Sequence, residues 1–347
     1  MKILEAGKKI GFIGLLLPVF GVATAVAADQ NALVVTAANA AQNQLLVYTT
    51  GGQLVQTVST QGKGGVSGNA GGIETNGDIV AVVNFGSQNV SIFEHDGDGM
   101  RFKYLVPSVS SPVSVAFGAG HLYILGTTKV ESHQIWGSDV SSSPDGVVTL
   151  LVADGSSAQV GVVENQLIIT EKSNMIETVD LLSDGAVGGA PAKVLNIPSN
   201  VNTPFGLVTR GNDAYVTIAH SNEISLVRNG AILTITGSGT QSAPCWLALV
   251  GPFLFSSNSP SMSVSRYAVY GQKIVQDAAV AATLNGDPTD IASGGGMVAV
   301  IDGNGTVSHL SIFSVDEDGN LTMNGAATID SPANGAAIVT GGNQLPE

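Results

Sequence analysis

Two side chains suited to acid–base chemistry follow apolar segments in the middle of the chain. Glu171 ends the run at residues 167–171, and His220 follows another run at residues 213–218. A positioned carboxylate can act as a general base, and histidine changes its charge near neutral pH. Each also has a simpler interpretation, as a solvated loop ion for Glu171 and as a surface residue for His220. We treat both as candidate catalytic residues, which requires that they converge in one concave pocket.

Six further residues near the ends of apolar segments are candidates for contact with a ligand. Lys172 is adjacent to Glu171 at a predicted strand end, so the two side chains point to opposite sides and only one can face a shared opening. Trp246 offers a large apolar surface for stacking on a ligand, or for packing between structural units. The candidate ligand-binding residues are Asn84, Lys172, Phe205, Trp246, Asn258 and Asp302.

The sequence lacks the motifs that bind metal ions and cofactors. The run at residues 302–305, Asp-Gly-Asn-Gly, lacks the further acidic positions of an EF-hand and fits a turn. His and Cys do not cluster, and there is no phosphate loop, dinucleotide fingerprint or nucleophile elbow. Cys245 is the one cysteine, which excludes an internal disulfide and leaves a nucleophile or a small buried apolar residue as its interpretations. We therefore expect no metal site and no cofactor.

The first 28 residues have the pattern of a secretory signal peptide. Lys2, Lys8 and Lys9 precede an apolar run at residues 10–26, and small residues occupy positions 23–28. The alternative is an N-terminal membrane anchor, although the apolar run is short for a span. The sequence thus predicts a mature domain of residues 29–347 that is secreted or periplasmic, with no stable membrane span after signal removal.

The net charge restricts the possible partners. The full chain carries a charge of −14, and the predicted signal contains three Lys and one Glu, so the mature chain stands at −16. Such an acidic chain repels phosphate backbones, so we expect no nucleic-acid partner. A small molecule or an extracellular protein is the partner that remains.

A four-strand pattern recurs along the mature chain. Charged residues make up 12% of the sequence and Gly numbers 44, a composition that favours strands joined by tight turns. In residues 71–106, short strand patterns alternate with turns, and Asp96-Gly97-Asp98-Gly99 is a strong hairpin signal. Prolines 112, 204, 244, 288 and 332 mark the start of several copies, and a period in the forties with four strands is typical of a propeller blade.

The two ends of the mature chain complete a seventh unit. Residues 32–59 supply three strands, and residues 336–340 supply one more. We therefore expect an all-β fold, a single seven-bladed β-propeller of four-stranded antiparallel blades, closed by the C-terminal strand joining the N-terminal blade. Deletion of residues 331–347 should then destabilise the whole ring. A parallel β-helix is the competing architecture, but two-residue turns cannot join parallel strands.

Three segments carry a resemblance to a known family. Residues 167–176, 203–206 and 242–247 resemble the lactonase-type seven-bladed propellers, which include bacterial 6-phosphogluconolactonases and fungal carboxymuconate lactonizing enzymes. The chain is most similar to the secreted, carboxymuconate cyclase-like branch. The resemblance implies His, Arg and Glu around a central opening. The corresponding positions here read Ser157-Ala158-Gln159, Pro204-Phe205 and Ala219-His220.

Two functions follow from this comparison of residues. The first is an exported binding or scaffold propeller that lacks the usual acid–base set of the family. The alternative is a lactone hydrolase or carboxymuconate-type cycloisomerase with a rearranged site, in which Glu171 and His220 would do the chemistry. The fold alone does not choose between them.

Overall fold

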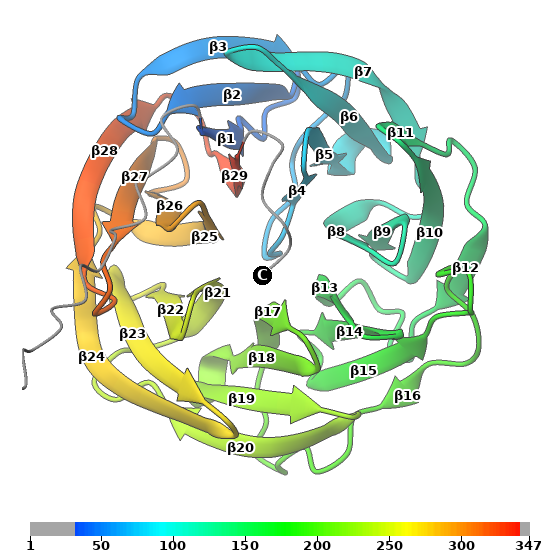
Figure 1. Cartoon of the computed structure of the whole chain (residues 1–347). Coiled ribbons are helices and arrows are strands. Elements are labelled where there is room, and N and C mark those ends of the chain that lie inside the picture. The colour runs from blue at the N-terminus through cyan, green and yellow to red at the C-terminus, as the bar shows by residue number, and fades with distance from the viewer. Residues whose placement is uncertain (1–31, 341–347) are drawn as a thin grey trace, which may run out of the picture.

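The computed structural model describes residues 32–340, which form seven antiparallel sheets arranged around a central axis (Figure 1). Each sheet is one blade, with its first strand nearest the axis and its fourth at the rim. The predicted seven-bladed β-propeller is confirmed. The predicted signal peptide, residues 1–28, lies outside the described residues. Between residues 32 and 340, no helix has the length and apolar character needed to cross a membrane.

The first four blades follow the chain from its N-terminal side. The strands of blade 1 are β29 (Asn334–Val339), β1 (Leu33–Ala37), β2 (Gln44–Thr49) and β3 (Leu54–Ser59). Those of blade 2 are β4 (Ile73–Asn76), β5 (Ile79–Asn84), β6 (Asn89–Asp96) and β7 (Gly99–Pro107). Those of blade 3 are β8 (Pro112–Gly118), β9 (His121–Gly126), β10 (Lys129–Trp136), β11 (Asp139–Val140) and β12 (Gly146–Thr149). Those of blade 4 are β13 (Ser157–Val163), β14 (Gln166–Glu171), β15 (Met175–Asp180) and β16 (Ala192–Lys193).

The remaining three blades have four strands each. Blade 5 contains β17 (Pro204–Arg210), β18 (Asp213–Ile218), β19 (Glu223–Arg228) and β20 (Ala231–Gly237). Blade 6 contains β21 (Pro244–Val250), β22 (Phe253–Asn258), β23 (Ser263–Tyr270) and β24 (Lys273–Thr283). Blade 7 contains β25 (Asp287–Gly294), β26 (Met297–Gly303), β27 (Ser308–Val315) and β28 (Leu321–Ile329). Two short 3-10 helices, η1 (Phe85–Ser87) and η2 (Ala219–Ser221), follow second strands.

Burial falls from the inside of each blade to its rim. The second strands β5 and β26 are buried at every residue, because both of their faces pack against neighbouring blades. The fourth strands, such as β20, alternate between exposed and less exposed positions. The core therefore consists of apolar layers between the blades, and the rim is the solvated edge.

The ring closes as predicted. β29 pairs with β1 in antiparallel register, with Leu33 opposite Val339. The Thr36 hydroxyl adds a hydrogen bond to the Gly335 carbonyl at 2.7 Å. Blade 1 is thus built from both ends of the described chain. That removal of residues 331–347 destabilises the ring stays a prediction, and the melting temperature of a truncated chain would check it.

Blades 3 and 4 depart from the predicted pattern at the rim. In blade 3 the two-residue strand β11 follows β10, and the fourth-strand position is taken by β12, which begins at Gly146 and ends at Thr149. The Asp145 carboxylate contacts His121 Nε2 at 2.8 Å and accepts a hydrogen bond from Ser132 Oγ at 2.5 Å. In blade 4 the fourth strand, β16, has two residues, Ala192–Lys193. The rim strand is the least constrained of the four, because one of its edges has no neighbour.

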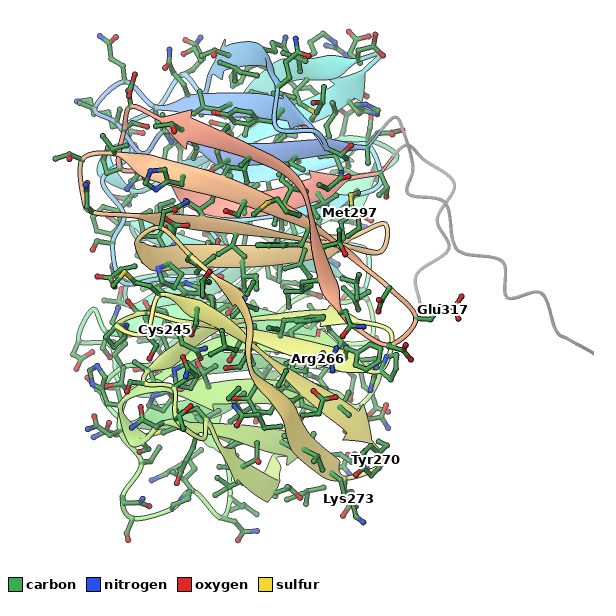
Figure 2. All side chains as sticks on the ribbon, turned by 90° about the vertical axis from the view of Figure 1, so that its left-hand side faces the viewer. Cys245, Arg266, Tyr270, Lys273, Met297 and Glu317 are labelled. Carbon is green, nitrogen blue, oxygen red and sulfur yellow. The ribbon has the colours of Figure 1, made fainter. Side chains whose placement is uncertain are left out.

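The side view defines two faces of the ring (Figure 2). Cys245, at the start of a first strand, lies near the face that carries the connections between blades, which we call the connection face. Met297, directly after a first hairpin turn, and Glu317, in a rim hairpin, lie toward the opposite face, which we call the hairpin face. Each first strand therefore runs from the connection face to the hairpin face.

Candidate functional site

A cavity of about 280 Å³ lies on the axis of the ring. Residues from the first strands of all seven blades line it, from β4, β8, β13, β17, β21, β25 and β29. Most of these side chains are aliphatic, and the polar ones are few. Ligand pockets in proteins usually occupy about 300–1,000 Å³, so this cavity suits a small molecule.

The segment at residues 63–72, which we call the plug, closes the cavity toward the connection face. It joins β3 to β4, and the chain around β4 reaches the centre of the ring (Figure 1). Trp246 Nε1 donates to the Asn69 carbonyl at 2.9 Å, and Asn69 Nδ2 donates to the Val113 carbonyl at 2.7 Å. The Ala70 amide donates to the Ala158 carbonyl at 3.2 Å. The plug is thereby fixed to blades 6, 3 and 4 across the axis.

One glycine of the plug has a specific steric role. Gly71 has a φ of +61°, in the left-handed region that L side chains rarely adopt. A Cβ atom at this position would also lie 3.0 Å from Gln159 Nε2 and 3.1 Å from Ser114 Oγ. Because Gly71 itself lines the cavity, a side chain here would both strain the plug and crowd the cavity wall.

A recurrent irregularity selects which side chains of the first strands face the axis. The strand register shifts near the start of β13, β17, β21 and β25, directly before Gln159, Leu207, Trp246 and Asp290. A bulge of this kind re-aims the next side chain. All four of these residues line the cavity, whereas Ser114, which follows the corresponding shift in β8, does not.

Two carboxyl groups face the cavity. Asp290 is 3% exposed, and its oxygens accept hydrogen bonds from the amides of Ile291 at 2.9 Å and Ala336 at 3.1 Å. Burial raises the pKa of Asp290 to about 8, and the negative charge of Glu74 contributes in the same direction. Burial also raises the pKa of Glu74, which is partly exposed where it lines the cavity, to about 7. Both groups can therefore exchange protons near neutral pH.

The other functional groups of the cavity are an amide, aromatic rings and the hydroxyls of Thr75, Thr209 and Ser293. Gln159 Oε1 accepts a hydrogen bond from the Leu207 amide at 2.6 Å, which leaves the Gln159 NH₂ group as a donor. Trp246 and Phe117 lie in the wall. Phe205 packs edge-to-face on Trp246, with 5.3 Å between the ring centroids. No Lys, Arg or His is among the lining residues within the described chain.

The structure brings three of the predicted site residues to the cavity or its plug. Trp246 is in the cavity wall, and Phe205 packs behind it at 5% exposure. Lys172 Nζ donates to the Gly68 carbonyl of the plug and, at 3.4 Å, to the Ser157 carbonyl. Burial lowers the pKa of Lys172. These residues support the site, and their contact with a ligand stays a prediction.

Four predicted residues lie elsewhere, at or near the ends of second strands beneath the connection face. Their side chains are fully buried and lie outside the cavity: Asn84, Glu171, Asn258 and Asp302. Asn258 Nδ2 donates to Ser263 Oγ at 3.1 Å and Ser265 Oγ at 2.9 Å. Asp302 lies 3.0 Å from His309 Nδ1. These side chains form a buried polar layer that fixes the loops above them.

Glu171 and His220 do not meet in the axial cavity. Glu171 is 0% exposed beside the carboxylate of Glu177. His220 is exposed on η2, with Nδ1 at 2.9 Å from Thr203 Oγ1. Neither side chain lines the cavity. Acid–base catalysis by this pair requires that both side chains converge in one pocket, and they do not converge in the axial cavity. Their catalytic role stays a prediction.

Cys245 is partly buried, and burial raises the pKa of its thiol to about 12. A thiol with such a pKa is almost entirely protonated at neutral pH, and the thiolate is the nucleophile. This environment agrees with the interpretation of Cys245 as a packing residue.

Asp290 and Glu74 were not among the predicted site residues. The available signal was an acidic residue inside a first-strand segment, at residues 72–74 and 290–292, where the corresponding segments at 113–117, 159–163 and 205–208 are uncharged. A charge inside an otherwise apolar strand must face either solvent or a cavity. In a ring whose first strands surround the axis, such a residue points to the axial cavity.

Comparison with solved structures shows the same fold in proteins of low sequence identity. Periplasmic gluconolactonase PpgL of Pseudomonas aeruginosa is 14% identical, with a TM-score of 0.64 over 89% of this chain and 99% of that chain. A "putative 6-phosphogluconolactonase" of Bacteroides fragilis is 13% identical, with a TM-score of 0.62 over 89% and 98%. A functionally unknown protein of Desulfotomaculum acetoxidans is 12% identical, with a TM-score of 0.67 over 90% and 99%. No protein-family description matches the sequence, and no curated protein is similar to it. The predicted likeness in fold to lactonase-type propellers is confirmed.

Proposed function

We propose that this chain is an exported binding propeller that holds a small molecule in its axial cavity and does not hydrolyse lactones. One observation carries the proposal. The cavity is closed toward the connection face by a hydrogen-bonded plug, and its described lining contains no Lys, Arg or His. Lactone hydrolysis generates an oxyanion that a nearby cation would stabilise, and the described lining has no cationic side chain.

The construction of the cavity supports binding. Its wall consists of strand backbone from every blade, and the plug is hydrogen-bonded to three of them. Functional sites on rigid elements keep their geometry without further ordering, which reduces the entropic cost of binding. The cavity surface combines apolar side chains with polar groups, which can fix the orientation of a bound small molecule.

Export is the second part of the proposal. It rests on the signal-like residues 1–28 and is compatible with the periplasmic gluconolactonase of Pseudomonas aeruginosa that shares the fold. The ligand would then be an extracellular or periplasmic small molecule. An extracellular protein partner would need a different surface.

A cavity-filling variant tests the binding site. Ala292 lines the cavity and is partly exposed, so Ala292→Phe should fill it. Ala192→Phe, at an exposed position of β16, is the matched control. Compounds that raise the melting temperature of the purified protein should be found in a metabolite panel, and Ala292→Phe should abolish the shift while Ala192→Phe keeps it. If Ala292→Phe is well folded and still responds to every compound, the axial site is wrong.

A lactone panel tests the enzymatic alternative. Purified protein should give no turnover of carboxymuconolactone or 6-phosphogluconolactone above the uncatalysed rate. Turnover that is lost in a folded Glu171→Ala or His220→Ala variant would establish a rearranged active site instead. Turnover that both variants keep would also refute the non-catalytic proposal.

A further inference from the structure

From the charge and the aromatic lining of the axial cavity, we infer that its ligand is a small organic cation, an ammonium group on a compact apolar body. This inference rests on the proposed binding function and adds the chemical class of the ligand. Among the described residues that line the cavity, the charged ones are Asp290 and Glu74, and both are acidic. They come from blades 7 and 2, which lie on either side of the closing strand β29.

Asp290 keeps acceptor capacity after its internal hydrogen bonds are counted. Its oxygens accept one backbone amide each, from Ile291 and Ala336. An ionised carboxylate offers about four lone-pair positions, so further donors can still bind. The two amides also fix the orientation of the carboxylate, so a cation meets a positioned acceptor.

The wall and the plug add groups that favour a cation over an anion. Trp246 and Phe117 present aromatic rings, and the negative face of such a ring attracts a cation. In the plug, Asn69 is 1% exposed, and its Oδ1 has no hydrogen-bond partner. Asn69 directly precedes Ala70, which lines the cavity. The Asn69 carbonyl accepts a hydrogen bond from the indole N–H of Trp246. The side-chain donors around the cavity, the Gln159 NH₂ group and the hydroxyls of Thr75, Thr209 and Ser293, are all uncharged.

Proton release is a consequence of this assignment. Burial raises the pKa of Asp290 to about 8 and of Glu74 to about 7, so both are partly protonated at neutral pH. A bound ammonium ion favours the ionised carboxylates and therefore expels protons. Affinity for a cation should rise as the pH increases through this range, whereas affinity for a neutral molecule of the same shape should not.

Isothermal titration of the purified protein with three probes of matched shape tests the inference. The probes are benzylammonium, benzyl alcohol and benzoate. Benzylammonium should bind at least about tenfold more tightly than benzyl alcohol, a difference of about 1.4 kcal/mol, and benzoate should bind most weakly. The heat of benzylammonium binding should change between two buffers of different ionisation enthalpy, because protons are released.

Two substitutions locate the charge effect. Glu74→Gln should weaken benzylammonium about tenfold and leave benzyl alcohol unchanged. Glu317→Gln removes the same charge from an exposed rim turn and should change neither (Figure 2). Asp290→Asn should have the larger effect on benzylammonium, but it disturbs two backbone hydrogen bonds, so Glu74→Gln carries the test if that variant fails to fold.

The outcomes separate this inference from the binding function. If benzyl alcohol or benzoate binds as tightly as benzylammonium, the cation assignment is wrong while the axial site stands. If benzylammonium binds best but neither carboxyl variant weakens it, the assignment to Asp290 and Glu74 is wrong. If no probe binds, and no compound in the panel responds to Ala292→Phe, both proposals fail.

Discussion

The second strands of blades 2 and 4 end in buried polar residues at matching positions, Asn84 and Glu171, and their surroundings differ. Asn84 Oδ1 accepts from Asn43 Nδ2 at 3.0 Å and Thr60 Oγ1 at 2.8 Å. Its Nδ2 donates to Asn89 Oδ1 at 2.9 Å and Ser91 Oγ at 2.7 Å. The amide therefore uses its full hydrogen-bonding capacity inside blade 2 and the adjoining loops.

Glu171 has no such network. Neither of its carboxylate oxygens has a hydrogen-bond partner, and one oxygen of the neighbouring Glu177 also lacks one. Burial raises the pKa of Glu171 to about 8, and the charge of Glu177 contributes in the same direction. An amide can both donate and accept, whereas an ionised carboxylate only accepts. Glu177 accepts a hydrogen bond from the Leu151 amide at 2.8 Å, and a hydrogen bond between the two carboxyl groups requires a proton on one of them. The same place in the repeat is thus neutral in blade 2 and proton-dependent in blade 4.

The largest effect should come from removing the centre of the satisfied network. Asn84→Ala removes the partner of two buried donors, Asn43 Nδ2 and Thr60 Oγ1, and of one buried acceptor, Ser91 Oγ. An unsatisfied buried group costs about 1–3 kcal/mol, so we expect a destabilisation of about 3 kcal/mol. Urea unfolding followed by circular dichroism would measure it. Asn324→Ala, on an exposed rim strand, is the control and should cost well under half as much. Equal losses in the two variants would show that the Asn84 network adds no stability.

The blade-2 network also shows why the fold could be predicted from sequence. A polar residue at the end of a second strand, a hairpin turn and a proline at the next first strand recur in most copies, so local signals agree with the overall ring. The hairpins at Gly97–Asp98 and Asn229–Gly230 formed as expected. The closure of the ring by the C-terminal strand was predicted by counting the strand patterns at the two ends of the mature chain. Rim strands in blades 3 and 4 were predicted less well, because their sequence is weakly constrained by packing.

The candidate site could be predicted only in part. Trp246 and Phe205 follow prolines at first strands, and their aromatic character marked them. Asp290 faces the axis because of a register shift after Pro288, and a shift of one residue changes the side to which every later side chain points. Such bulges, and the path of the plug across the axis, depend on contacts between blades that no local pattern encodes. The same limit applies to Glu171, whose burial results from the connection that passes over blade 4.

The next largest effect should be a pH-dependent gain from Glu171→Gln. The folded-state pKa of Glu171, about 8, exceeds its ordinary value of 4.5, so between these values the folded protein keeps a proton that the unfolded chain releases. Stability from this group is therefore complete below about pH 4.5 and falls as the pH rises to about 8, by at most about 1.4 kcal/mol per unit. Glutamine cannot ionise, so the variant should be about 2 kcal/mol more stable than the parent near pH 8 and nearly equal to it near pH 4.5.

Urea midpoints of the parent and Glu171→Gln over this pH range would measure that difference. The comparison between the two proteins matters, because Asp290 and other buried groups titrate in both. A constant difference at all pH values would contradict the assignment of the proton to the Glu171–Glu177 pair.

The smallest effect should come from Glu131, which occupies in blade 3 the place of Glu177 in blade 4. Both oxygens of Glu131 accept from the Val109 amide, at 3.1 and 3.3 Å. The neighbour of Glu131 is His133, with Nε2 at 3.7 Å from Oε1, whereas the neighbour of Glu177 is the carboxyl group of Glu171. Glutamine can still accept from Val109, so Glu131→Gln should change stability by less than about 1 kcal/mol. A flattening of the stability–pH profile in Glu131→Gln equal to that in Glu171→Gln would contradict this comparison. The pH dependence would then come from burial of any glutamate beneath the connection face, and not from the two adjacent carboxyl groups of blade 4.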